Sequence, residues 1–135
     1  MTYLLDTSIC ISILRPKDPN HIKVAQRIKA LNKNTISLCS IVKAELWVGA
    51  EKSNDRVKAQ KVLHVLFKEF DSIPFDDSAA SHYGTIRSIL EKFGTTIGSN
   101  DLLIGAIALS RDLILITHNI KDFSKIPGLK IEDLV

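Results

Sequence analysis

The sequence predicts an α/β protein with a central parallel sheet of about five strands covered by helices. Short apolar segments of strand length alternate along the chain with longer segments whose apolar residues recur every three or four positions. Such alternation is typical of parallel sheets, because each parallel strand needs a crossover helix to reach the next one. The chain has 135 residues, of which 45% are hydrophobic. This size fits a single domain, residues 1–135, built around one core.

An acid lies between the first predicted strand and the first predicted helix. The apolar run that ends at Leu5 predicts a short buried strand over residues 2–5. Thr7 and Ser8 then offer hydroxyls that can cap a helix, and Pro16 ends that helix because proline cannot donate a backbone hydrogen bond. Asp6 therefore falls at the carboxyl end of a strand.

The alternation then repeats. Apolar residues at helical spacing predict a helix over residues 22–31, which closes at the asparagines of residues 32–34. Residues 35–39 are apolar enough for a second strand. Both elements are short, as expected for one compact sheet and its covering layer.

A third helix carries the second acid of interest. Ser40 is the expected N-cap, and the helix should reach about Val48 and stop at Gly49. Glu45 then lies in the second turn, inside an otherwise apolar segment. A carboxylate at such a place needs a partner if it is buried.

Residues 56–70 form an amphipathic pattern with a basic outer side. Apolar residues recur at helical spacing, and between them lie Lys58, Lys61 and Lys68. Two interpretations stay open for the lysines: a solvated helix face, or a surface that contacts phosphates.

The second half of the chain continues the pattern. Residues 72–75 predict a third strand, followed by a helix that Asp76 caps and Gly94 ends. Ser99 is the expected cap of the next helix, in which residues 102–109 are apolar almost all round. A helix of that kind should be central and covered on several sides.

The last third of the chain completes the sheet. Residues 113–117 predict a fourth strand, residues 122–123 a short helical turn, and residues 129–131 a fifth strand.

Three acids adjoin apolar segments: Asp6, Glu45 and Asp101. In a parallel sheet, the carboxyl ends of the strands and the amino ends of the following helices share one edge, so the three side chains can meet there. The first-turn position of Asp101 should also favour its ionised form. Taken singly, Asp6 and Asp101 can equally be helix caps, and Glu45 a surface acid. Together they predict a site for a hard divalent cation.

Charge and composition limit the functions that the protein can have. The net charge is +3, and without the three acids 18 basic residues face 12 acidic ones, or +6. This excess favours a polyanionic partner, although charge alone does not identify one. No apolar run reaches the ~18 residues of a membrane span, and the amino terminus does not resemble a signal peptide, so we expect a cytoplasmic protein without membrane contact.

Other chemistries lack their residues. Cys10 and Cys39 lie among apolar neighbours without zinc-ligand spacing and are expected to be reduced core thiols. The four histidines are dispersed, and no glycine-rich phosphate loop occurs. A haloacid dehalogenase phosphatase would need an acid at the position of Ser8, and a response-regulator receiver would need a phosphorylatable acid within residues 37–40.

Five blocks of the sequence follow one another in order: Leu4–Ser8, Ala44–Ser53, Tyr83–Arg87, Ile97–Ile104 and Thr117–Phe123. Together they resemble the motifs of PIN-domain ribonucleases of the VapC toxin family. Each block alone is modest, but five collinear blocks over nearly the whole chain are specific. The resemblance implies a three-layer α/β/α fold, RNA cleavage that depends on Mg²⁺ or Mn²⁺, homodimers, and a VapB antitoxin that blocks the site.

The resemblance also implies residue roles. Asp6, Glu45 and Asp101 match the acidic triad that would bind metal and activate water. Asp122 is the better candidate for a fourth acid, because Asn119 stands where many PIN domains carry Asp. Ser8 replaces a frequent Asn near the first acid. The implied supporting residues are Ser8, Thr117, Asn119 and Asp122.

The predicted function is therefore the toxin of a type II toxin–antitoxin pair, a metal-dependent endoribonuclease whose expected substrate is tRNA. Two alternatives stay open: a catalytically silent PIN-fold module that binds RNA or protein, and a metal-dependent DNA nuclease. The preference for RNA rests on the resemblance. Trp47, Tyr83 and Phe123 are expected to pack in the core or a dimer interface rather than to stack on bases.

Overall fold

The predicted parallel sheet is confirmed by a computed structural model that describes residues 1–134. Five strands, all paired in parallel, follow the order β3-β2-β1-β4-β5. Their bounds are β1 Tyr3–Leu5, β2 Ile36–Cys39, β3 Asp71–Ile73, β4 Ile114–Ile116 and β5 Lys130–Glu132.

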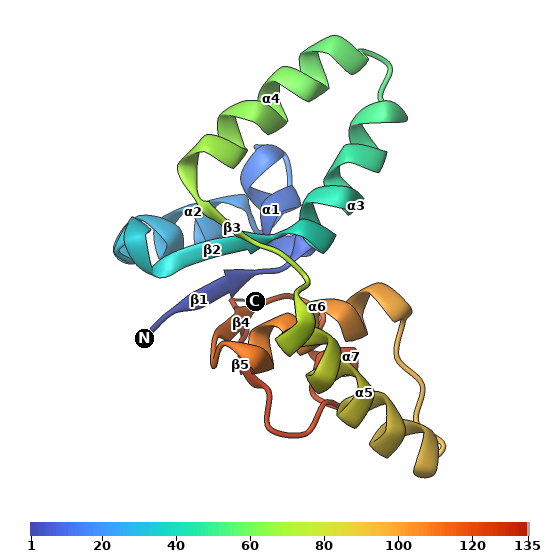
Figure 1. The fold of residues 1–135 in the computed structure, drawn as a ribbon. Coiled ribbons are helices and arrows are strands. Elements are labelled where there is room, and N and C mark those ends of the chain that lie inside the picture. Colours follow the sequence, from blue (N-terminus) through green and yellow to red (C-terminus); the bar gives the residue numbers. More distant parts are fainter. Residues whose placement is uncertain (135) are drawn as a thin grey trace.

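The helices form the two outer layers (Figure 1). In chain order they are α1 Thr7–Leu14, α2 His21–Ala30, α3 Ser40–Glu51, α4 Arg56–Glu69, α5 Asp77–Lys92, α6 Ser99–Ser110 and α7 Ile120–Phe123. From β1 the chain moves one way through β2 to β3, and then crosses back to β4 and β5. Right-handed crossovers in opposite directions place their helices on opposite faces. Figure 1 accordingly shows α1, α3 and α4 above the sheet and α5, α6 and α7 below it.

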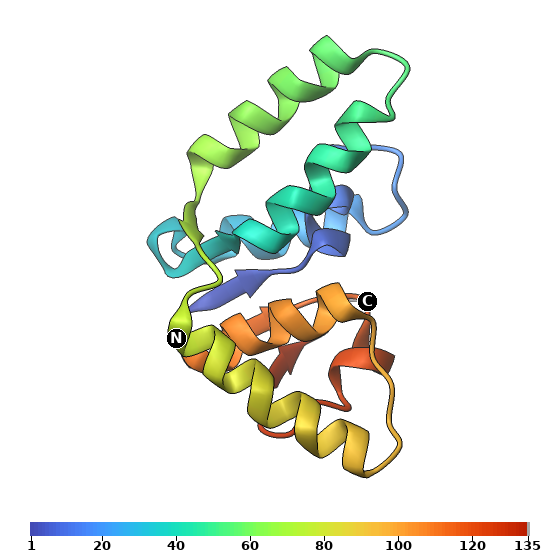
Figure 2. The same ribbon diagram turned by 45° about the vertical axis from the view of Figure 1, so that its right-hand side comes forward.

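Figure 2 shows how differently the two outer layers pack. The green α3–α4 hairpin starts at the sheet and extends away from it, whereas α5 lies side by side with α6, which packs against β4. Trp47 holds the hairpin together, because its ring meets His64 and Phe67 of α4 edge-on at centroid distances of 5.2 and 5.4 Å. Helix α6 is central, as predicted: Ile104, Ala106, Ile107 and Ala108 are fully buried.

The core lies on both faces of β1 and β4. Leu4, Leu5, Leu115 and Ile116 have no exposed surface, as expected for strands covered on both sides. Cys10 and Cys39 are buried and free, and burial raises the pKa of both thiols, that of Cys39 to about 11. They are core thiols, as predicted. No helix in the described part of the chain is long and apolar enough to cross a membrane.

Several expected helix boundaries are wrong by one to three residues. Helix α3 continues through Gly49 to Glu51, because the flanking turns pack well enough to outweigh the cost of a helical glycine, about 1 kcal/mol. Ser40 and Ser99 are the first residues of their helices, and the caps are Cys39 and Gly98.

The third strand is earlier than predicted. It occupies Asp71–Ile73 rather than residues 72–75, because Pro74 has no N–H to continue the ladder. Residues 130–132 form the fifth strand, one position later than expected.

Some apolar stripes are only partly buried. Val57 and Val62 of α4 are 64% and 40% exposed, and Ile22 of α2 and Phe93 after α5 also face outward. Each of these residues lies on the outward-facing side, or at the end, of its helix. Phe123, in contrast, is fully buried, while Trp47 and Tyr83 are partly buried and packed against the core.

Two glycines offer a matched stability test. Gly49 is helical with open space where a Cβ would lie, whereas Gly128 has a φ of +79°. We expect Gly49→Ala to raise the free energy of unfolding by about 0.5–1 kcal/mol through helix propensity, and Gly128→Ala to lower it by about 1 kcal/mol through left-handed strain. Urea denaturation measures both. A destabilised Gly49→Ala would show that residue 49 is not in a regular helix.

Candidate active site

The site is built where β1 and β4 lie side by side, at the point where the strand order reverses. The backbone N–H of Asp6 donates to the carbonyl of Ile116 at 3.0 Å, which extends the β1–β4 ladder by one residue. Asp6 and Thr117 therefore leave the sheet as neighbours, although 111 positions separate them in the sequence. Ligand sites of open parallel sheets form at this reversal.

Asp6 is an acid inside the protein. It is only 4% exposed, and Thr117 beside it is fully buried. Its Oδ2 accepts hydrogen bonds from Thr117 Oγ1 at 2.6 Å and from Ser8 Oγ at 3.1 Å. Its backbone starts α1, but its side chain makes no capping bond. The carboxylate is therefore turned away from the helix amides and towards the sheet edge, which rules out the simple helix-cap interpretation.

Glu45 lies in the second turn of α3, as predicted, and its Oε1 accepts a hydrogen bond from Thr7 Oγ1 at 2.8 Å. The sequence suggested Thr7 only as a cap of α1. Instead it joins α1 to α3 at the site, which no local pattern signals because 38 positions separate the two residues.

Asp101 and Asp122 meet through an amide. Asp101 is in the first turn of α6 and Asp122 in the short helix α7. Asn119 Nδ2 donates to Asp101 Oδ2 at 3.0 Å and to Asp122 Oδ2 at 3.3 Å. Lys125 lies 3.5 Å from the other oxygen of Asp122. Asn119 thus bridges two acids, while Asp122 brings a carboxylate with a partly compensating cation.

The acids act on one another. Partial burial, and then the charges of Asp6, Glu45 and Asp122, raise the pKa of Asp101 to about 6, against a small opposing effect of the Asn119 hydrogen bond. The expected advantage of the helix amino terminus for the ionised form is therefore outweighed. A raised pKa of this origin indicates that the four carboxylates share one region of the molecule.

The arrangement is an open acidic site rather than a closed cage. Within residues 1–134, no three His, Cys, Asp or Glu side chains are grouped closely enough to ligate one ion. The hydrogen bonds described above use Asp6 Oδ2, Glu45 Oε1 and Asp101 Oδ2, and the second oxygen of each carboxylate takes no described hydrogen bond. These oxygens are the donors that hard cations prefer.

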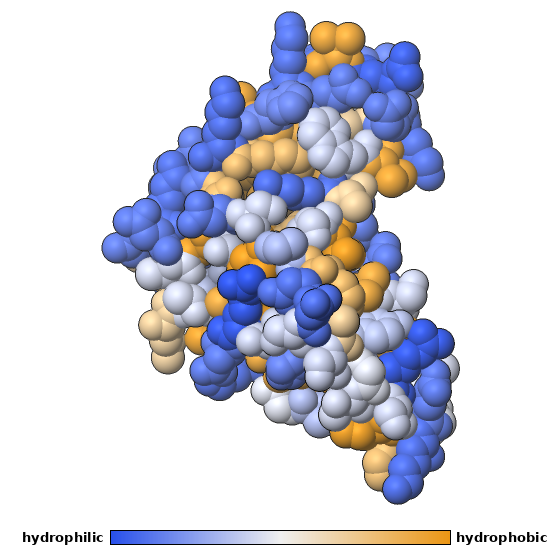
Figure 3. All heavy atoms as spheres, in the orientation of Figure 1, coloured by the Kyte–Doolittle hydropathy of each residue, from blue (hydrophilic) through white to orange (hydrophobic). Residues whose placement is uncertain are grey.

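A groove leads away from the site. It has a volume of about 820 Å³, begins at Thr7 and Glu45, and runs between α1, α3 and α4. Its walls are partly apolar, and three basic residues line it: Arg15, Lys52 and Lys58. Figure 3 shows apolar residues between hydrophilic ones over the α3–α4 hairpin.

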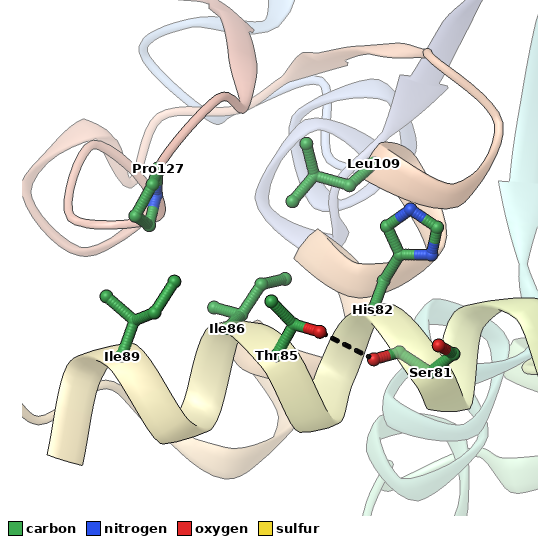
Figure 4. A pocket seen from close by; sticks show the side chains of 7 residues that line it. All are labelled: Ser81, His82, Thr85, Ile86, Ile89, Leu109 and Pro127. Atoms are coloured by element: carbon green, nitrogen blue, oxygen red, sulfur yellow. Dashed lines mark hydrogen bonds between the residues drawn. The ribbon is translucent and has the colours of Figure 1, made fainter. Parts of the chain in front are cut away.

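A second hollow lies apart from the acids. In Figure 4, Thr85, Ile86 and Ile89 of α5 face Leu109 and Pro127 across a space of about 330 Å³. The site acids do not line it, and its walls are largely apolar. It therefore adds nothing to the chemistry of the carboxylates.

Fold and site together define a three-layer α/β protein with a cluster of acids at the reversal of a parallel sheet. Comparison with known proteins identifies the family of this protein. The family model of the PIN domain matches residues 3–129. Ribonuclease VapC2 of Rickettsia felis is 38% identical over 133 residues, and the tRNA(fMet)-specific endonuclease VapC of Salmonella typhimurium is 36% identical over 135 residues; in each case 98% of both chains is covered.

Solved structures agree. The promoter-bound VapBC2 structure from Rickettsia felis contains a chain with a TM-score of 0.87 at 34% identity, which covers 98% of both chains. The DNA-bound VapBC structure from Salmonella typhimurium gives a TM-score of 0.91 at 32% identity and covers 100% of this chain and 99% of that one. The chain belongs to the PIN-domain family, in its VapC ribonuclease branch.

The raised pKa of Asp101 predicts a pH dependence of stability in metal-free buffer. The folded state, with a pKa of about 6, holds a proton that the unfolded state, with a pKa of ~3.9, has lost. The free energy of unfolding should therefore fall as pH rises from about 4 to about 6. Asp101→Asn should flatten this fall, and Asp112→Asn, an exposed control on the surface, should not. Equal slopes for wild type and Asp101→Asn in urea titrations would contradict the assignment.

Proposed function

We propose that the chain is a metal-dependent endoribonuclease, the toxin of a VapBC-type toxin–antitoxin pair, which cuts structured RNA with tRNA as its expected substrate. One observation carries the proposal: Asp6 is buried at the sheet reversal, hydrogen-bonded to Thr117 and Ser8 and electrostatically linked to Asp101. Full-length similarity to ribonucleases and to a tRNA-specific endonuclease supports it.

The donor set fits Mg²⁺ or Mn²⁺. Every candidate ligand is a carboxylate oxygen, and Mg²⁺ usually keeps several waters and is held by one or two carboxylates. Asp6 and Asp101 would hold the ion directly, and Glu45 and Asp122 would complete the site through water. This division agrees with an open site that lacks a ready three-acid cage.

A bound divalent cation lowers the pKa of a coordinated water and offsets the charge that develops on the phosphate. The residues of the chain prepare the site for it. Thr117 and Ser8 fix one oxygen of Asp6, Thr7 fixes one oxygen of Glu45, and Asn119 fixes one oxygen of Asp101. Each acid thus keeps a single orientation with its other oxygen available.

The substrate should be a polyanion that approaches an otherwise basic molecule. With the three acids left out, the chain carries an excess of six positive charges (18 − 12). Such an excess raises the rate of encounter with nucleic acid without reading its sequence. The choice of RNA, and of tRNA within it, rests on the names of the similar proteins.

The proposed partners are a VapB-type antitoxin and a second copy of the chain. Several similar solved structures are VapBC complexes. The groove that starts at Glu45 could hold an antitoxin segment, and a basic side chain of that segment would pair with the acids through charge-assisted hydrogen bonds. Light scattering of the chain alone, and of the chain co-expressed with a VapB-type antitoxin, would measure the assembly.

Cleavage of a total tRNA pool with Mn²⁺ tests the activity. We expect discrete cuts by wild type, at least about 100-fold slower cutting by Asp6→Asn and Asp101→Asn because metal ligands should matter more than the residues around them, and none with EDTA. Asp112→Asn is the matched control, since it changes an exposed acid at a backbone φ of 53° that Asn tolerates.

The outcome also separates the alternatives. Faster cutting of DNA than of RNA would make the chain a DNA nuclease. Retained RNA binding without cutting of tRNA or ribosomal RNA would make it a silent binding module.

Metal binding itself is measurable without RNA. A Mn²⁺ concentration 100 times the dissociation constant should stabilise the folded protein by about 2.7 kcal/mol, because the ion binds the folded state and not the unfolded chain. Thermal melting at neutral pH follows this stabilisation, and Asp6→Asn should abolish most of it. An unchanged melting temperature for wild type would count against a metal site.

A further inference from the structure

A partly buried chain of polar side chains behind the site ends on a histidine that the proposed chemistry does not use. Ser12 of α1 is 1% exposed, and its hydroxyl lies 3.2 Å from His118 Nε2 and donates to Asp18 Oδ1 at 3.1 Å. Asp18 also accepts from the amide of Asn20 at 2.9 Å. The His118 ring is therefore tied to α1 and to the turn that follows it.

This cluster is not a hydrolase triad. In such a triad the histidine stands between serine and acid, whereas here Ser12 stands between His118 and Asp18. Ser12 is also too buried to meet a substrate. These hydrogen bonds must therefore serve a purpose other than nucleophilic catalysis.

The backbone of the same histidine reaches the site. The amide of His118 donates to Ser8 Oγ at 3.2 Å, and the amide of Asn119 donates to Thr117 Oγ1 at 2.9 Å. Each hydroxyl oxygen thus receives one amide proton, and its own proton points to Asp6 Oδ2. Two successive amides therefore make Ser8 and Thr117 donors to the central acid.

We propose that His118 is a positioning residue, whose ring, held by Ser12, fixes the segment 117–119 so that Thr117 and Ser8 orient Asp6 and Asn119 orients Asp101. The inference rests on the proposed function. It adds a set of residues behind the carboxylates, of the kind that usually tunes metal affinity.

The hydrogen-bond directions make the proposal specific. Ser12 has one proton and gives it to Asp18, which as a carboxylate can only accept. His118 Nε2 must therefore donate to Ser12, while the buried Nδ1 has no hydrogen-bond partner among the described residues. Glutamine can place its amide nitrogen where Nε2 lies, whereas the shorter asparagine reaches only the position of Nδ1.

The test compares wild type with Ser12→Ala, His118→Gln and His118→Asn. Ser110→Ala is the matched control, because Ser110 is a part-buried helix serine whose hydroxyl donates to the nearby carbonyl of Ile107 in its own helix. Two readouts are taken: the Mn²⁺ concentration that gives half of the thermal stabilisation without RNA, and kcat and KM for tRNA cleavage at saturating Mn²⁺.

We expect Ser12→Ala and His118→Asn to raise the half-maximal Mn²⁺ concentration by about 10–100-fold and to lower kcat with KM unchanged. His118→Gln and Ser110→Ala should stay close to wild type. Equal behaviour of the Gln and Asn variants, or lower melting temperatures without any change in Mn²⁺ dependence, would overturn the positioning role. A wild type that neither binds Mn²⁺ nor cuts RNA would instead overturn the proposed function, and this inference with it.

Discussion

The parallel pairing of β1 with β4 is the constraint on which the site depends. These strands come from opposite ends of the chain, and their registration, Leu5 opposite Ile116, decides that Asp6 leaves the sheet beside Thr117. A shift of one residue would turn every side chain of the strand to the other face. Because the two strands are buried on both sides, the apolar core holds this registration, and the geometry of the acids follows from packing.

The acids in turn impose a cost on the fold that the core has to offset. Asp6 is nearly inaccessible to water, and its charge is compensated by two hydroxyls rather than by a cationic side chain. Hydroxyl donors stabilise a carboxylate without neutralising it. The site therefore keeps its negative charge for a cation, as proposed, while a direct ion pair with Lys or Arg would have cancelled it.

Much of the architecture could be predicted from the sequence. The parallel sheet and the places of Asp6, Glu45 and Asp101 follow from local patterns, because strand ends and first helical turns are visible as short apolar runs with polar flanks. The roles of Thr7, Ser12 and His118 could not be predicted this way. They depend on contacts between residues 38 and 106 positions apart, and nothing local marks them. Two local predictions are wrong for the opposite reason: the end of α3 at Gly49 and the burial of Val57. There tertiary packing, or its absence on one side of the α3–α4 hairpin, outweighs the local preference.

The two outer strands of the sheet limit how other proteins can join it. Strands β3 and β5 are three residues long and carry Asp71, Lys130 and Glu132. Short, charged edges resist the addition of a further strand from another chain. Strand addition, one of the common ways to capture an extended peptide, is therefore disfavoured at either edge. Recognition by another protein is therefore expected through the helices and loops of this molecule, and the same two segments disfavour the assembly of copies into an extended cross-β sheet.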